Sequence, residues 1–211
     1  MGLALLYELH THTEEHSPCS KVSAVELIKA AIDKGLNGLI LTDHHYLWPT
    51  EEIQILRLTV PVPETFLLAS GQEVTTADVG DVLVYGAPVA IGPGILLHEL
   101  RRQFPDAALV LAHPWRGQQR PSMLELFNAN LDAIEVLNRH HRFSQNRRAL
   151  REWFSLGFVA TAGTDAHDRA VGVYPTAFPD DVKTFAGLVS GIKAGACKPL
   201  LKSRRHQIYM S

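Results

Sequence analysis

Eleven histidines occur among the 211 residues, and most of them lie in short patches close to acidic residues. The patches contain His10, His12, His16, His44, His45, His113, His140, His141 and His167. Only His98 and His206 stand alone. Neutral imidazole is the commonest metal ligand in proteins. Histidines scattered over the surface are the ordinary alternative, but these patches follow apolar runs directly, which favours a site.

Two of the patches have the spacing of paired ligands. His10 and His12 form a His-x-His motif, and Asp165 and His167 repeat this spacing with an acid. In an extended segment, residues i and i+2 point to the same side, so both members of each pair can reach one cation.

Three further positions could add ligands: the adjacent Asp43 and His44, then Glu73, then His113. Each one alone has an ordinary explanation, such as a helix cap for Asp43 or a core histidine for His113. Together, they supply more nitrogen and oxygen ligands than one ion needs, since zinc typically takes four. Seven or more ligands in one place predict two or three ions, with Glu73 as the bridge.

The elements that would position these residues alternate between strand and helix. Strands are expected at 3–9, 38–42, 65–69, 81–86, 107–112, 133–137 and 158–162. Helices are expected from about 23 to Gly35, and over 96–103, 122–128, 144–156 and 180–194. This order predicts an α/β fold with a mostly parallel sheet. A closed barrel gathers strand ends on one face, whereas an open doubly wound sheet offers one crevice, so the barrel fits the scattered ligands better.

Composition limits the class of protein. There are 20 Lys+Arg and 22 Asp+Glu, a net charge of −2, and 46% hydrophobic residues, which predicts one globular domain with a sizeable core. No apolar run reaches the roughly 18 residues of a membrane span, and the start is not typical of a secretory signal. Two cysteines cannot form a disulfide framework, so a cytoplasmic location is expected.

Five strings follow one another along the chain: ELHTHT, LTDHH, GQEV, AHP and GTDAH. They resemble the motif pattern of the PHP (polymerase and histidinol phosphatase) family, and the resemblance extends from Leu6 to about Pro179. It implies a single-domain, distorted (β/α)7 TIM-like barrel over residues 1–195, with a basic tail over 196–211. It also implies a two- or three-metal centre that hydrolyses phosphoesters. The positions that match family ligands are His10, His12, His44, Glu73, His113, Asp165 and His167.

The chain departs from this pattern at two places. Cys19 stands where the family usually has an acid or histidine after His-x-His, and His16 lies three residues earlier as a possible substitute. Between His113 and Asp165 the family places another ligand, for which Glu135 and either His140 or His141 are candidates, with His141 preferred.

Arginine recognises phosphate through its planar fork of donors. Arg116, Arg142 and Arg169 lie next to proposed ligands and are the expected substrate-binding residues. The stretch 139–151 carries five arginines and no acid, a pattern that could follow a nucleic-acid backbone.

The expected function is hydrolysis of a phosphoester by a metal-bound hydroxide, with manganese, zinc or iron as the ion. The substrate would be a small phosphorylated molecule, a nucleotide or a short nucleic acid, and no membrane partner is expected. Two alternatives remain. One is an amidohydrolase-type hydrolase, although no lysine ends a middle strand to serve as its bridge. The other is a non-catalytic metal-binding module associated with a polymerase.

Overall fold

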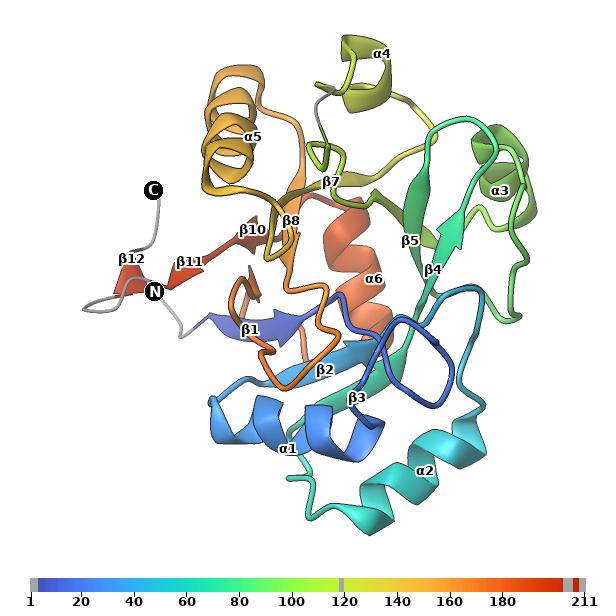
Figure 1. The fold of residues 1–211 in the computed structure, drawn as a ribbon, viewed down its shortest axis with the longest axis vertical. Helices are drawn as coiled ribbons and strands as arrows, with labels where there is room; N and C mark the ends of the chain where they lie inside the picture. The colour runs from blue at the N-terminus through green and yellow to red at the C-terminus, as the bar shows by residue number, and fades with distance from the viewer. Residues whose placement is uncertain (1–3, 118–119, 203–206, 209–211) are drawn as a thin grey trace.

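The computed structural model describes residues 4–117, 120–202 and 207–208 (Figure 1). The strands are β1 (Leu5–Glu8), β2 (Gly38–Leu41), β3 (Leu67–Ser70), β4 (Gln72–Thr75), β5 (Asp81–Tyr85), β6 (Ala108–Leu111), β7 (Ala133–Asn138), β8 (Ala160–Gly163), β9 (Thr176–Phe178), β10 (Lys198–Pro199), β11 (Leu201–Lys202) and β12 (Gln207–Ile208). The helices are α1 (Ala24–Asp33), α2 (Thr50–Thr59), α3 (Leu97–Gln103), α4 (Met123–Leu126), α5 (Phe143–Leu156) and α6 (Phe185–Lys193). None of the helices in this described part of the chain has the length and apolar character needed to cross a bilayer.

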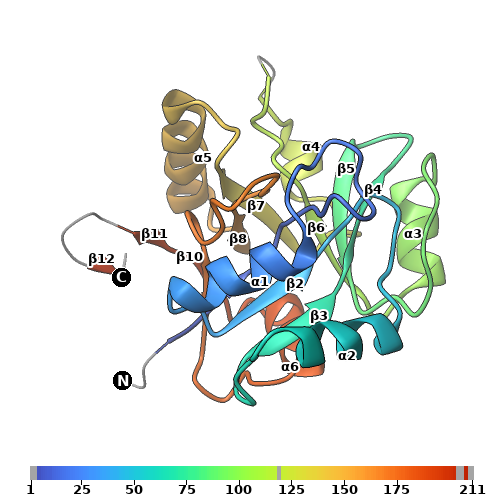
Figure 2. The ribbon, with the colours of Figure 1, turned by 60° about the horizontal axis from the view of Figure 1, so that its bottom comes forward.

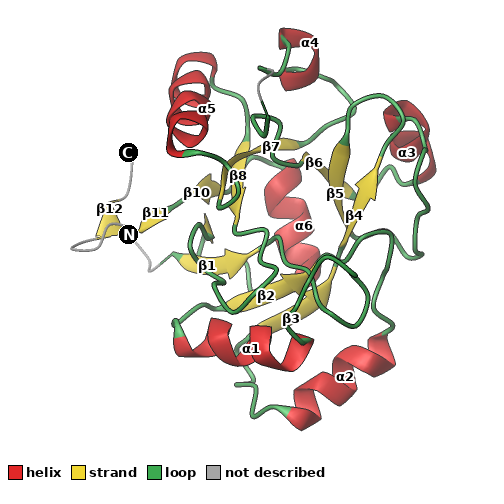
Figure 3. Ribbon diagram, in the orientation of Figure 1, coloured by secondary structure: helices red, strands yellow, loops and turns green. Residues whose placement is uncertain are grey.

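The strands form two mixed five-stranded sheets (Figure 3). The first has the order β10-β9-β1-β2-β3, and the second has the order β4-β5-β6-β7-β8, while β11 and β12 make a separate pair. Pairing is parallel along β1-β2-β3 and β6-β7-β8, but antiparallel along β4-β5-β6 and β10-β9-β1.

The expected (β/α)7 TIM-like barrel is therefore wrong, because the described strands do not close into one ring. Only Gly71 separates β3 from β4, so the chain passes between the sheets without a helix. The hairpin from β4 to β5 and the return of β9 beside β1 then reverse the strand direction. The alternation of apolar runs and helices along the chain does not reveal these reversals of strand direction.

The two sheets share an inner core and carry separate outer layers. The inner cluster includes Tyr7 and Ile40 of the first sheet, Leu83 and Val110 of the second, and Leu188 of α6. Helices α1 and α2 cover the first sheet, whereas α3, α4 and α5 pack on the second (Figure 2). In this arrangement, loops follow the carboxyl ends of β1, β2, β6, β7 and β8.

Several local signals in the sequence produce the expected elements. Ser23 and Glu26 form a capping box that begins α1, and Ser122 and Glu125 form another that begins α4. Gly157 ends α5 with a φ of 72°, a left-handed conformation that suits glycine. The helices therefore begin where the sequence predicts them, although α4 ends at Leu126 and not at residue 128.

A buried carboxylate joins the two sheets at the end that carries the candidate ligands. Glu8, at the end of β1, is fully buried and accepts hydrogen bonds from Thr164 N at 2.8 Å, Gly172 N at 2.7 Å and His10 N at 3.2 Å. The Thr164 hydroxyl donates to it as well. Burial raises the pKa of Glu8, although these hydrogen bonds act in the opposite direction. Glu8 thus holds the loop after β8 against β1.

Replacing Glu8 with Ala is expected to lower the free energy of unfolding by about 3 kcal/mol or more. The change leaves buried N–H groups without an acceptor, each of which costs about 1–3 kcal/mol. Urea denaturation of the variant measures the effect, and Glu51→Ala, at an exposed position on α2, is the control. A loss below 1 kcal/mol for Glu8→Ala would show that Glu8 does not join the sheets.

Candidate metal centre

The candidate ligands follow the ends of strands from both sheets. His10 and His12 come after β1, His44 comes after β2, Glu73 lies on β4, His113 follows β6, and Asp165 and His167 follow β8. Beyond the strand ends, isolated bridges join Thr11 to Ala166 and His44 to Glu73. These contacts bring segments distant in sequence to one place, as the motif spacing predicts.

Glu73 lies at the centre of this cluster and is 1% exposed. Its Oε2 atom is 3.4 Å from His10 Nε2, 3.1 Å from His12 Nε2 and 3.2 Å from His44 Nδ1. Its Oε1 atom is 2.9 Å from His113 Nε2. The two oxygens of one carboxylate therefore face different imidazoles.

Asp165 is the second buried carboxylate that faces the histidines of this cluster. Its Oδ1 atom is 3.6 Å from His10 Nε2, 3.2 Å from His12 Nε2 and 3.5 Å from His167 Nδ1. Its Oδ2 atom pairs with the guanidinium of Arg116. Asp165 thus faces the histidines with one oxygen and an arginine with the other.

Five groups of three side chains have ligand atoms within 4.8 Å of one another among the described residues. They are His12–His44–His167, His10–His12–Glu73, His10–His113–Asp165, His140–Asp165–His167 and Glu73–Asp81–His113. The groups share members, so they describe one extended centre. Mixed imidazole and carboxylate donors at this density suit divalent ions such as manganese, iron and zinc.

The electrostatics of the centre also fit cations. Burial raises the pKa of Glu73, but the charge of His10 and hydrogen bonds from three histidines outweigh it and hold the pKa well below its usual range. For Asp165, His10, His12 and Arg116 likewise outweigh burial and lower the pKa. Both carboxylates therefore keep a negative charge in a buried site, where positive charge must compensate it.

Backbone strain is concentrated at the same place. Among the residues that the structure describes, three non-glycine residues have positive φ angles: His45 at 56°, His113 at 33° and Asp165 at 56°. Such conformations cost about 1–3 kcal/mol each and cluster at functional sites. All three residues contribute to the centre or adjoin one that does.

Two further carboxylates hold the ligand loops without joining a ligand group. Asp43 accepts hydrogen bonds from Thr13 N at 2.7 Å, Thr13 Oγ1 at 2.9 Å, Ser17 Oγ at 2.6 Å and Trp48 Nε1 at 2.7 Å. These donors occupy both oxygens. The structure therefore assigns Asp43 to the support of the loop after β1.

Glu135 supports the other side of the centre. Its Oε1 atom is 3.1 Å from His10 Nδ1, and its Oε2 atom accepts from His113 N at 2.9 Å and Asn138 Nδ2 at 3.0 Å. A carboxylate on the second ring nitrogen fixes the orientation of a ligating histidine. A Cβ at Gly163 would lie 2.3 Å from Glu135 Oε1 and 2.5 Å from His10 Cβ, so only glycine fits there.

Three other candidates lie outside the ligand groups. His16 stacks on Tyr46 with ring centroids 3.6 Å apart. His141 is buried; its Nδ1 lies 2.9 Å from Asn146 Oδ1, and its Nε2 has no hydrogen-bond partner among the described residues. His140, the neighbour that was not preferred, is the one in a ligand group. Cys19 is exposed and lines the pocket that opens onto the centre.

The mouth is an open pocket of about 460 Å³, lined by Cys19, Arg116, His140 and His167. Of the three predicted substrate-binding arginines, Arg116 alone lines it. Arg169 is 74% exposed and pairs with Glu26, and Arg142 is exposed at the start of α5. Arg116 is therefore the one of these three arginines that lies at the mouth of the centre.

Sequence reasoning missed Glu8 and Asp81. Glu8 is an acid within an apolar strand, a signal that could have indicated a buried carboxylate. Asp81 begins β5, and its Oδ2 lies 3.9 Å from His113 Nε2. Its contact depends on the antiparallel pairing of β5 with β4, which the sequence pattern does not reveal.

A family model described as PHP-associated matches residues 143–197. No curated protein sequence matches the chain. The fold is similar to that of PsfC from Pseudomonas syringae PB-5123, with a TM-score of 0.71 and 20% identity over 96% of this chain and 93% of that one.

Two further solved structures share the fold. One is a proposed metal-dependent phosphoesterase from Bifidobacterium adolescentis, with a TM-score of 0.59 and 16% identity over 79% of this chain and 90% of that one. The other is the lesion-specific endonuclease EndoQ from Pyrococcus furiosus, with a TM-score of 0.62 and 16% identity over 93% of this chain and 58% of that one. The PHP-associated model over residues 143–197 confirms the resemblance to the PHP family that the motifs indicated, and the solved structures show a similar fold.

Proposed function

We propose that the protein hydrolyses phosphoesters at a centre that holds two or three divalent metal ions. The observation that carries this proposal is Glu73, whose two oxygens face separate imidazoles at 2.9–3.4 Å within a buried cluster. A carboxylate that faces two sets of ligands suits a centre where ions lie about 3.5–4 Å apart and act together on one phosphoryl group.

The residues that would hold the ions are those of the five ligand groups. Glu73, His10, His12 and Asp165 occupy the buried interior, His113 adjoins them beside Asp81, and His44, His140 and His167 lie toward the mouth. Bound ions would supply Lewis-acid activation of the phosphoryl group and of the attacking water. Manganese, zinc and iron all suit this donor set.

The chain's own residues would bind and orient the substrate. Arg116 lines the mouth and uses one nitrogen on Asp165, which leaves donors on its fork for phosphoryl oxygens. His140 and His167 line the same pocket, so a phosphoryl group bound there lies against the ligand groups. Glu135 and Asp43 hold the ligand loops in register while the substrate binds.

The rival chemistries differ in the substrate that they turn over. An amidohydrolase would cleave an amide or carboxylic ester, and a metal-binding module without activity would cleave neither. The division into a domain over 1–195 and a tail over 196–211, of which 203–206 and 209–211 lie outside the described residues, also stays a proposal, as does the cytoplasmic location.

Replacing Glu73 with Gln is expected to reduce the bound metal to one ion or fewer and to lower phosphoesterase kcat at least 100-fold. The amide keeps the shape but loses the charge that the cations need. Elemental analysis of the purified variant and hydrolysis of bis(p-nitrophenyl) phosphate with added manganese measure both effects. Glu64→Gln, at an exposed position, is the matched control. Full metal content with full turnover in Glu73→Gln would contradict the proposal, as would cleavage of amides in place of phosphoesters.

Replacing Arg116 with Ala is expected to lower kcat/KM for phosphoesters about 10- to 100-fold, or about 1.4–2.7 kcal/mol, while metal content stays unchanged. Arg169→Ala should leave kcat/KM within about twofold, because Arg169 pairs with Glu26 on the surface away from the pocket. Equal losses for the two variants would remove Arg116 from its assigned role.

A further inference from the structure

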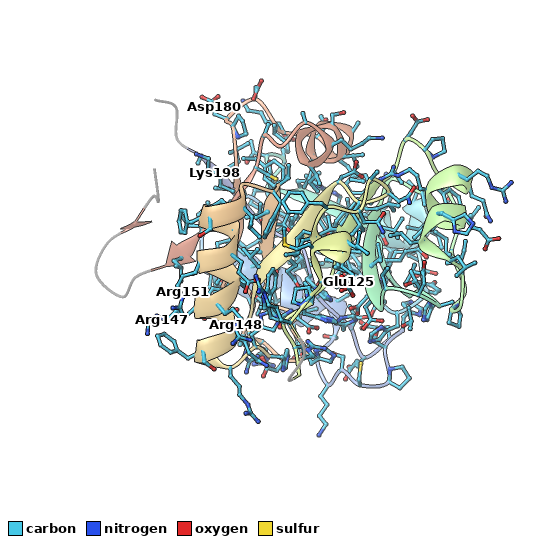
Figure 4. All side chains as sticks on the ribbon, turned by 90° about the horizontal axis from the view of Figure 1, so that it is seen from above. Glu125, Arg147, Arg148, Arg151, Asp180 and Lys198 are labelled. Carbon is cyan, nitrogen blue, oxygen red and sulfur yellow. The ribbon has the colours of Figure 1, made fainter. Side chains whose placement is uncertain are left out.

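Helix α5 carries positive charge that no nearby acid neutralises. Among the described residues, each of Arg101, Arg116, Arg120, Arg139 and Arg169 pairs with a carboxylate. Arg147, Arg148 and Arg151 on α5, and Arg142 just before it, are exposed and take part in no described ion pair. Figure 4 shows Arg147 and Arg151 on the outer side of α5 and labels Arg148 on the same helix.

The one acid of α5 does not offset these charges. Glu152 is turned toward the body of the molecule, where Arg120 Nε lies 2.8 Å from its Oε1 and Trp115 Nε1 donates to its Oε2 at 3.1 Å. Its side chain is 12% exposed. The outward face of the helix is therefore positive over its whole middle, although the chain carries a net charge of −2.

The basic face starts beside the mouth of the metal centre. His140, two residues before Arg142, places its Nε2 atom 2.9 Å from Asp165 O. At the first turn of α5, Gln145 donates to Gly117 O, next to Arg116. A chain of phosphates that begins at the pocket can therefore continue onto α5.

We propose that α5 binds the sugar–phosphate backbone of a nucleic acid, one of whose phosphates lies at the metal centre. This inference rests on the proposed phosphoesterase function and names its substrate class. Arg151 lies nine positions after Arg142, which is about 14 Å along a helix. A small phosphoester in the pocket cannot span that length, whereas several successive phosphates of one strand can.

The apolar residue at the start of the helix fits the same partner. Phe143 is 84% exposed. In the sequence it follows His140, which lines the pocket, and precedes the three arginines of α5. An exposed aromatic ring beside a basic track is the arrangement that binds single strands, because bases stack on the ring while arginines contact phosphates. An acidic protein as the partner would explain the arginines of α5 but not the exposed ring of Phe143.

The test replaces Arg147, Arg148 and Arg151 together with Gln. The holoenzyme variant should bind a fluorescein-labelled 20-nucleotide single strand at least tenfold more weakly in fluorescence anisotropy. The slope of log K against log salt should fall in magnitude by about 2, since each lost phosphate contact removes about 0.7. Hydrolysis of bis(p-nitrophenyl) phosphate should stay within about twofold of the wild type, because the pocket is untouched.

A control variant carries the same change in net charge elsewhere. Lys29, Arg102 and Lys183 are exposed on other parts of the surface, and their joint replacement with Gln should leave binding of the strand within about twofold. Equal weakening by both triple variants would overturn the inference, as would unchanged binding in the α5 variant. Polyglutamate that competes as well as the unlabelled strand would mark an acidic protein as the partner and would overturn it too.

Binding and turnover separate this inference from the proposed function. If the wild type binds the strand through α5 but cleaves no phosphoester, the function fails and the binding face stands. If it cleaves bis(p-nitrophenyl) phosphate but binds no strand, the function stands and the inference is overturned.

Discussion

Two ionised carboxylates, Glu73 and Asp165, lie buried among imidazoles, and most of the surrounding structure serves to keep them there. Burying a charge is costly unless opposite charge and hydrogen bonds compensate it. The compensation here comes from His10, His12 and Arg116, which lower the pKa of Asp165 against the effect of burial. Because several charges lie close together in this cluster, a small displacement of any of these side chains would raise its free energy. The supporting carboxylates accordingly accept several donors each, and Gly163 stands where a side chain would meet His10 and Glu135.

The two-sheet architecture explains how such a cluster forms without a closed barrel. The parallel strands of both sheets end on the same side, and α6 packs between the sheets in the inner core. At that end single bridges, rather than full ladders, join the loops, and Glu8 links β1 to the segment after β8. Loops freed from the regular ladder can adopt the positive φ angles of His113 and Asp165. The cluster thus requires that the ends of the strands converge, but it does not require that the strands close into a barrel.

The sequence predicts the parts of this structure that depend on local chemistry. Capping residues, Gly157 and apolar periodicity place α1, α4 and α5, and motif spacing predicts which polar residues come together. The sequence does not predict the features that depend on local signals too weak to read or on contacts between distant segments. Helix α2 is not predicted from the sequence, because its apolar face is weak and only Leu56 is buried. Strand β9 is not predicted either, because it is only three residues long. The roles of Asp43 and His140 depend on contacts with residues distant in sequence, namely Thr13 for Asp43 and Asp165 for His140.

The same distinction separates the two arginines that flank the ligand motifs. Arg116 and Arg169 each follow a proposed histidine ligand by two or three residues, so spacing alone treats them alike. In the fold, the turn after β6 directs Arg116 to Asp165, whereas the loop after His167 brings Arg169 to Glu26 of α1. A guanidinium that compensates a buried carboxylate loses little mobility when a phosphoryl group arrives, because the ion pair has already ordered it. Arg116 therefore combines two tasks, stabilising the charge of the centre and presenting an ordered fork to a substrate, and Arg169 can perform neither.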